Sequence, residues 1–263
     1  MRPLLLSTLA LTCAVLPLGN ASAEMYRLQL RFSDQAGVPT TTATARKLLG
    51  QDVTISDFDE QFKPQADGKT YRLEAEIPMP RTVALVSKLD KVRRLSEGSL
   101  TKAGWLGHRM LEQRGTRSDI LEARLSPKRD RITFLRNQKT VEEKRVDGLV
   151  TDLMSLPYLW MGRPVQAKPL TISVFDAKKL HPKQTFVASR MEIIFNKSRV
   201  NVVQFQLKRT TSADANLLLW IREADGVPLR VELGLAEKYG VSAVSYPVQQ
   251  PAVATTTTTS KMR

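Results

Sequence analysis

The chain contains a single cysteine, Cys13. It lies in "MRPLLLSTLALTCAVLPLGNASAE", where one positive residue precedes an apolar stretch and a small-residue site at Ala21, Ser22 and Ala23. This pattern is typical of a secretory signal peptide, so we expect cleavage after Ala23 and a periplasmic location. The mature chain then has no thiol. This excludes disulfides, a thiolate nucleophile and a cysteine metal site.

Two alternatives exist for residues 1–23. A membrane anchor would need roughly 20 apolar residues to span a bilayer, whereas this run is shorter and Pro17 interrupts its end. Lipidation of Cys13 would require small residues before it, and Leu11 and Thr12 stand there instead. Both observations favour a cleaved signal peptide.

Residues that carry catalytic chemistry are scarce. The two histidines, His108 and His181, have no spacing suited to a metal site. No serine lies in a nucleophile motif, and no glycine-rich phosphate loop is present. The sequence therefore predicts no enzyme activity, no metal and no cofactor. Acidic residues are scattered, so a hydrolase of envelope glycans, with two carboxylates brought together by the fold, stays open as an alternative.

Negative charge is also under-represented, with 26 Asp and Glu against 40 Lys and Arg. Such an excess favours polyanions, and for an exported protein these are anionic lipids, lipopolysaccharide or acidic glycans. The densest cluster gives four candidate anion-binding residues: Lys128, Arg129, Arg131 and Arg136. A solvated surface is the alternative. The cluster lacks interleaved aromatic residues, which argues against a nucleic-acid partner.

The dominant pattern is period-two alternation, which is typical of strands with one buried face. Examples are "YRLEAEI", "PLTISVFD", "MEIIFNKSRVNVVQFQLKR" and the hairpin "LEARLSPKRDRITFLR". In "LLLWIREADGVPLRVEL" the pattern predicts a strand, a turn and a second strand. We expect a single β-rich domain over residues 24–246, irregular loops over residues 36–69, and a disordered tail over residues 247–263.

One segment, "VDGLVTDLMSLPYLWMG", has helical spacing. Asp147 is placed to cap a first turn, and Pro157 should end or kink the helix. Its apolar residues at helical spacing are Leu149, Val150, Leu153 and Met154. The expected fold class is mainly β: a strongly curved antiparallel sheet or open barrel around one principal helix. "TVALVSKLDKVRRL" fits a helix or a strand by periodicity alone.

The three tryptophans, Trp105, Trp160 and Trp220, are each flanked by apolar residues. Such positions are usually in the core. In the alternative, one or more of them lines a cavity for an acyl chain at the mouth of the sheet.

Several of these stretches resemble known families. "LWIREADGVPLRVEL" resembles a strand, turn and strand found in an uncharacterised family of exported bacterial proteins, a domain of unknown function. It is similar, more distantly, to the lipoprotein-carrier superfamily of LolA, LolB and RseB. "SEGSLTKAGWLGHRMLEQRG" and "VDGLVTDLMSLPYLWMGRP" extend the first resemblance to residues 70–245, although Pro157 departs from its helix motif. By this resemblance "TVALVSKLDKVRRLSEG" is a strand.

The resemblance implies an open antiparallel barrel around helices, which in the carriers binds lipid or lipopeptide chains, and it implies no catalytic residue. We therefore expect an exported, noncatalytic envelope protein that holds a lipid, acyl chain or partner segment in an apolar concavity. The alternative is a cationic module that binds lipopolysaccharide or acidic glycan. An envelope protein is a further candidate partner, and peripheral contact with a membrane is compatible with the charge. The sequence indicates no oligomeric state.

Overall fold

The computed structural model describes residues 24–33, 40–80, 90–115, 119–208, 216–236 and 240–248. The expected signal peptide lies outside the described residues. So do residues 81–89, which include the first part of the stretch that the resemblance assigns to a strand, and residues 249–263 of the expected tail. The second part of that stretch, residues 91–98, is a strand as expected. The first residue of that tail, Pro247, is instead the last residue of a strand.

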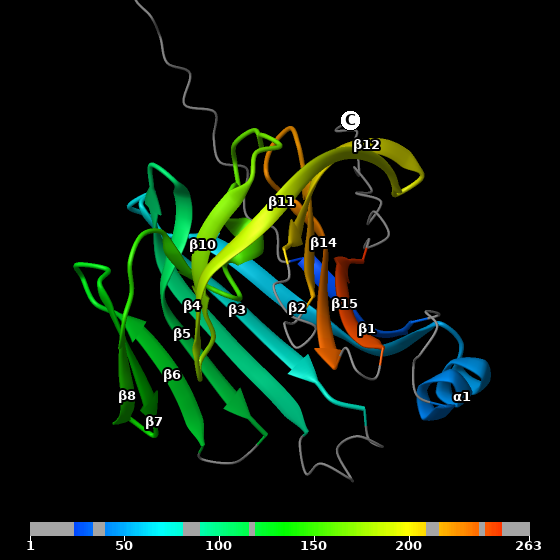
Figure 1. Ribbon diagram of the computed structural model, residues 1–263, viewed down its shortest axis with the longest axis horizontal. Helices are drawn as coiled ribbons and strands as arrows, with labels where there is room; N and C mark the ends of the chain where they lie inside the picture. The colour runs from blue at the N-terminus through cyan, green and yellow to red at the C-terminus, as the bar shows by residue number, and fades with distance from the viewer. Residues whose placement is uncertain are drawn as a thin grey trace, which may run out of the picture.

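A single sheet of fifteen strands contains most of the described residues (Figure 1). Its first half contains β1 (Glu24–Phe32), β2 (Asp52–Pro64), β3 (Thr70–Pro78), β4 (Lys91–Thr101), β5 (Gly104–Arg114), β6 (Ile120–Leu125), β7 (Arg131–Arg136) and β8 (Lys139–Arg145). Its second half contains β9 (Val150–Asp152), β10 (Leu170–Phe175), β11 (Leu180–Phe195), β12 (Ser198–Leu207), β13 (Leu217–Arg222), β14 (Pro228–Ala236) and β15 (Val241–Pro247). The α-helix α1 (Thr40–Leu49) and the 3-10 helix η1 (Leu156–Tyr158) complete the described elements.

The two halves are meanders that meet side by side. The strand order runs from β8 down to β1, and then from β15 down to β9. Strands β1 and β15 pair antiparallel from Tyr26 opposite Pro247 to Phe32 opposite Val241. All the other pairs of neighbouring strands are consecutive in the chain, and only β9 and β10 pair parallel among the described strands.

The sheet curls until its short end strand, β9, lies against β5. Figure 1 shows β3 to β6 on one side of the curl and β11, β12, β14 and β15 on the other. No backbone ladder joins β9 to β5 among the described residues, so the barrel is open. A side chain makes the junction instead, because the Gly107 N–H donates to the Thr151 hydroxyl at 2.9 Å.

The predicted hairpin is confirmed, because strands β6 and β7 pair antiparallel. The strand stretch "MEIIFNKSRVNVVQFQLKR" forms a second hairpin, in which β11 and β12 are joined by Asn196 and Lys197. Both turn residues have positive φ, as a two-residue hairpin requires. The strand, turn and strand of "LLLWIREADGVPLRVEL" are β13 and β14, and Arg222 and Asp225 pair at 2.7 Å in the turn.

The predicted principal helix is wrong. Residues 150–152 form β9, which pairs with β10, and only residues 156–158 are helical, in a single 3-10 turn. The apolar spacing of this segment reflects burial in the curl, where Val150 and Leu156 are fully buried. The edge of β10 supplies hydrogen-bond partners for an extended backbone, which outweighs a local preference for helix. We refer to residues 150–160 as the plug.

The expectation of irregular structure over residues 36–69 is also wrong, because α1 and β2 occupy most of this range. Strand β2 has its buried aromatic residues, Phe58 and Phe62, on one face. Between them Glu60 takes the place of an apolar residue and accepts a hydrogen bond from Tyr158. An inward carboxylate therefore concealed the alternation of this strand.

The core fills the curl around the plug. Leu156 and Leu159 pack with apolar residues of β10, β12 and β13, while Tyr158 packs with Phe62, Tyr71 and Trp105. In the part of the chain that the structure describes, no helix has the length and apolar character needed to cross a membrane.

Candidate functional site

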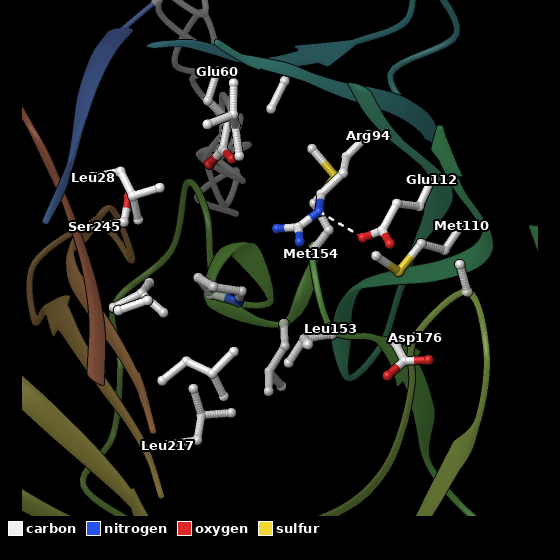
Figure 2. A pocket seen from close by; sticks show the side chains of 18 of the residues that line it. Leu28, Glu60, Arg94, Met110, Glu112, Leu153, Met154, Asp176, Leu217 and Ser245 are labelled. Atoms are coloured by element: carbon white, nitrogen blue, oxygen red, sulfur yellow. Dashed lines mark hydrogen bonds and ion pairs between the residues drawn. The ribbon is translucent and has the colours of Figure 1, made fainter. Parts of the chain in front are cut away.

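A cavity of about 390 Å³ lies inside the curl (Figure 2). Its walls come from both halves of the sheet and from the plug. Six apolar lining residues represent these elements: Leu28, Ile77, Leu153, Met154, Leu217 and Leu219. Because side chains alternate between the two faces of a strand, every second residue of each wall strand faces the cavity. The volume lies within the range of small-molecule sites, roughly 300–1,000 Å³.

An arginine pair with one carboxylate stands on the wall formed by β4 and β5. Glu112 is 7% exposed and accepts from Nε of Arg94 at 3.0 Å and from Nε of Arg114 at 2.7 Å. Burial acts to raise the pKa of Glu112, but the two guanidinium groups outweigh it and hold that pKa below its ordinary value of 4.5. This corner of the cavity therefore carries a carboxylate and two cations at neutral pH.

This pair predicts a pH dependence of stability. A carboxyl group with a depressed pKa in the folded state stabilises the fold above its unfolded pKa, and the contribution is lost as pH falls through the folded value. We expect the free energy of unfolding of Glu112→Gln to depend less on pH below about 4.5 than that of the parent. Urea denaturation across this acid range measures the difference. Parallel pH profiles for the two proteins would contradict the prediction.

Two further carboxylates line the cavity. Oε1 of Glu60 accepts from the Tyr158 hydroxyl at 2.5 Å. Oδ1 of Asp176 accepts from the backbone N–H groups of Lys178 and Lys179 at 2.6 and 2.8 Å. Burial acts to raise the pKa of Asp176, but hydrogen bonds from His181 and from these two N–H groups outweigh it, and the pKa is lowered.

Neither Glu112 nor Asp176 meets the requirement for the general acid of a glycan hydrolase. Such an acid must stay protonated near neutral pH, which needs a raised pKa. The pKa values of Glu112 and Asp176 are both lowered. Burial does raise the pKa of Asp152, but this side chain is fully buried and does not line the cavity.

Asp152 belongs to a buried polar network that fastens the plug to the sheet. It accepts from the hydroxyl groups of Ser96 and Ser155, both at 2.7 Å, and from the Ser155 N–H at 2.9 Å. The Ser155 hydroxyl also lies 2.9 Å from that of Thr151, and the Ser96 hydroxyl lies 3.2 Å from that of Tyr71. These bonds hold β9 against β4 and β5 where a backbone ladder is absent.

The three tryptophans lie at separate places and none of them lines the cavity. Trp105 is 2% exposed in the aromatic cluster behind the plug, and Trp220 packs with Val202 and Leu229. Trp160 stacks on Phe205 with ring centroids 4.3 Å apart, and it lines a second pocket with Arg163 and Lys168.

The four candidate anion-binding residues lie in different environments. Lys128 is exposed, whereas Arg131 and Arg136 pair with Glu143 at 3.5 Å and Asp119 at 2.6 Å. Arg129 is half-buried, and its Nη2 donates to the carbonyl groups of Gly107 at 3.2 Å and Val150 at 2.6 Å. One of the four is thus part of the junction between β9 and β5.

This difference predicts unequal costs for neighbouring substitutions. Arg129→Ala leaves two inward carbonyl groups without their donor, so it should lower the free energy of unfolding by about 1–3 kcal/mol. Lys128→Ala removes an exposed side chain of the same turn and should change stability by less than about 0.5 kcal/mol. Urea denaturation of both variants tests this. Equal midpoints for the two variants would contradict the role of Arg129 in the junction.

Three arginines on the outer face of β3 to β6 share two glutamates. Glu97 bridges Arg72 and Arg109, at 3.1 and 2.9 Å, and Glu122 bridges Arg109 and Arg124, at 2.5 and 2.6 Å. These two glutamates therefore offset part of the positive charge on this wall.

Sequence reasoning did not identify the polar residues of the cavity. A signal was present, because Arg94 shares its strand face with Val92 and Ser96, and Glu112 shares its face with Met110. A charged residue that alternates in phase with the buried residues of a strand points to the inner face of the sheet. This phase could have identified Arg94 and Glu112 from the sequence.

No protein-family model matches the chain, and no curated protein matches it. Among solved structures, it is similar to a beta-barrel-like protein of domain of unknown function DUF1849 from Brucella abortus, with 9% identity and a TM-score of 0.45 over 88% of this chain and 98% of that chain. It is also similar to a putative outer membrane lipoprotein-sorting protein domain from Vibrio parahaemolyticus, with 11% identity and a TM-score of 0.26 over 88% and 85%. These neighbours match the two groups that the sequence resembles.

Proposed function

We propose that this protein is a noncatalytic binding protein of the cell envelope, active in the periplasm, which holds the acyl chain of a lipid inside its curled sheet. The observation that carries the proposal is the cavity itself, whose lining side chains are mainly apolar, with leucine the most frequent. An apolar concavity with a few polar groups is the usual form of a site for an apolar ligand.

The size of the cavity favours a single chain. About 390 Å³ is near the lower limit of ligand pockets, roughly 300–1,000 Å³, so one acyl chain fits better than several. The methionines on the walls, Met110 and Met154, suit a flexible chain because an unbranched thioether adapts its rotamer to irregular contacts.

Blocking the cavity tests this function. Ser245 lines the cavity on β15, so Ser245→Phe should fill part of the space and weaken binding of the neutral apolar probe N-phenyl-1-naphthylamine about tenfold. Ser242→Phe, on the opposite face of the same strand, is the matched control and should bind as the parent does. Fluorescence titration measures both, and native mass spectrometry of protein purified from its own periplasm should show a retained lipid. Absence of probe binding by the parent would refute the proposal.

A further inference from the structure

We infer that the cavity selects an acyl chain with an anionic head group, and that Arg94 and Arg114 hold this head group at the rim. The inference rests on the proposed function and names the ligand class of the same site.

The position of Arg94 follows from the alternation of β4. Val92 and Ser96, two residues away on either side, are buried, so Arg94 shares the inner face with them. Its neighbour Arg93 points outward and pairs with Glu76 at 2.5 Å. Two adjacent arginines therefore lie on opposite faces of one wall, and only Arg94 reaches the cavity.

The guanidinium groups keep donors that the protein does not use. Arg94 and Arg114 both contact Glu112 through Nε, and across the described residues neither has another hydrogen-bond partner. Their Nη atoms are thus available to a ligand. Figure 2 shows the Arg94 guanidinium pointing into the cavity beside Met154 while its Nε faces Glu112. A guanidinium presents a planar fork that suits a carboxylate or a phosphate.

The carboxylates, by contrast, already accept hydrogen bonds. Both oxygens of Glu112 take an arginine Nε, Glu60 accepts from Tyr158, and Asp176 accepts two backbone N–H groups. Glu60 and Asp176 lie on either side of the Arg94–Glu112 pair in Figure 2. The lining as a whole holds three cations and three carboxylates, since Lys178 belongs to it as well. Within the group of Arg94, Glu112 and Arg114, two cations share one carboxylate, and this local positive charge attracts an anion in a partly desolvated site.

The exposure of the two arginine side chains indicates which end of the ligand lies at the rim. The side chains of Arg94 and Arg114 are 39% and 50% exposed, so the head group would stay in contact with water. Leu217 and Leu153 line the part of the cavity away from the Arg94–Glu112 pair (Figure 2), which suits the acyl chain. An ionised head group at the rim and an apolar chain inside avoid the cost of burying an unpaired charge.

Two ligands that differ only in the head group test the inference. The fluorescent fatty acid cis-parinaric acid carries a carboxylate, and parinaryl alcohol carries the same chain with a neutral end. We expect the parent to bind the acid about tenfold more tightly. Arg94→Gln should remove most of this preference and leave binding of the alcohol unchanged. The matched control is Arg93→Gln, which should bind both probes as the parent does.

Two more variants distinguish a change in head-group binding from a loss of folded protein. Arg114→Gln should act as Arg94→Gln does, and Glu112→Gln should have the opposite sign, with tighter binding of the acid, because it removes the carboxylate that competes for the arginines. Displacement by oleate or by oleoyl lysophosphatidate then distinguishes a carboxylate from a phosphate head group. If the acid and the alcohol bind equally and Arg94→Gln changes neither, the inference fails and the acyl-chain function stands. If neither probe binds the parent, the proposed function itself fails.

Discussion

Replacing Trp105 by alanine should lower the free energy of unfolding by about 3–5 kcal/mol, the usual cost of emptying a large aromatic site in a core. Trp105 is 2% exposed, and its ring meets those of Phe62 and Tyr71 edge to face at 5.5 and 5.7 Å. Its Nε1 also donates to the Met161 carbonyl group at 3.0 Å, so the indole connects β5 with the residue that follows the plug.

Urea denaturation of Trp105→Ala measures this cost. Leu100→Ala, at an exposed apolar residue of the neighbouring strand β4, is the control and should shift the midpoint little because its side chain is 46% exposed. An unchanged midpoint for Trp105→Ala would show that the aromatic cluster does not hold the plug.

Gly107→Ala should be comparably damaging, at about 3 kcal/mol or more, the upper end of the cost of overpacking a core. A Cβ at residue 107 would lie 1.6 Å from Oδ2 of Asp152 and 2.8 Å from the Ser155 hydroxyl oxygen. Neither partner can withdraw without breaking the buried network that fastens the plug. The variant should therefore lose the contact between β9 and β5 together with stability.

Gly68→Ala is the control for this substitution. Its Cβ would meet nothing within 4 Å, and its φ of +62° predicts a cost of only about 1–2 kcal/mol for a left-handed residue with a side chain. Chemical denaturation ranks the two variants, and amide hydrogen exchange of residues 150–158 reports on the plug directly. Equal stability of the two variants would contradict the role of Gly107.

The strands were predictable where one face is apolar and the other polar. "YRLEAEI" became β3, with Tyr71, Leu73, Ala75 and Ile77 all buried. Strand β2 was not predictable by this rule because Glu60 interrupts its apolar face. The plug was predicted as a helix because it is buried on several sides. The resulting apolar spacing fits a helix as well as an irregular buried segment.

The candidate site was less accessible to sequence reasoning than the fold. The apolar concavity was expected, but its residues come from strands far apart in the chain, such as Leu28 of β1 and Leu219 of β13. The tryptophans drew attention because aromatic residues dominate core energetics, yet they pack outside the cavity. Arg94 and Glu112 become partners only through the register of β4 and β5, which places them directly opposite each other.

The pairing of β1 with β15 also determines when the molecule can finish folding. All neighbouring strands but these two are consecutive, so each meander can form as its own residues become available. The seam between the meanders needs Val241–Pro247, which follow β1 by most of the length of the chain. Until these residues arrive, β1 and β14 each present an unpaired edge, which is a template for pairing with another chain. Pairing between strands so far apart in the chain is slow. Aggregation through these open edges therefore competes with the pairing of β1 and β15, which is a late step of folding.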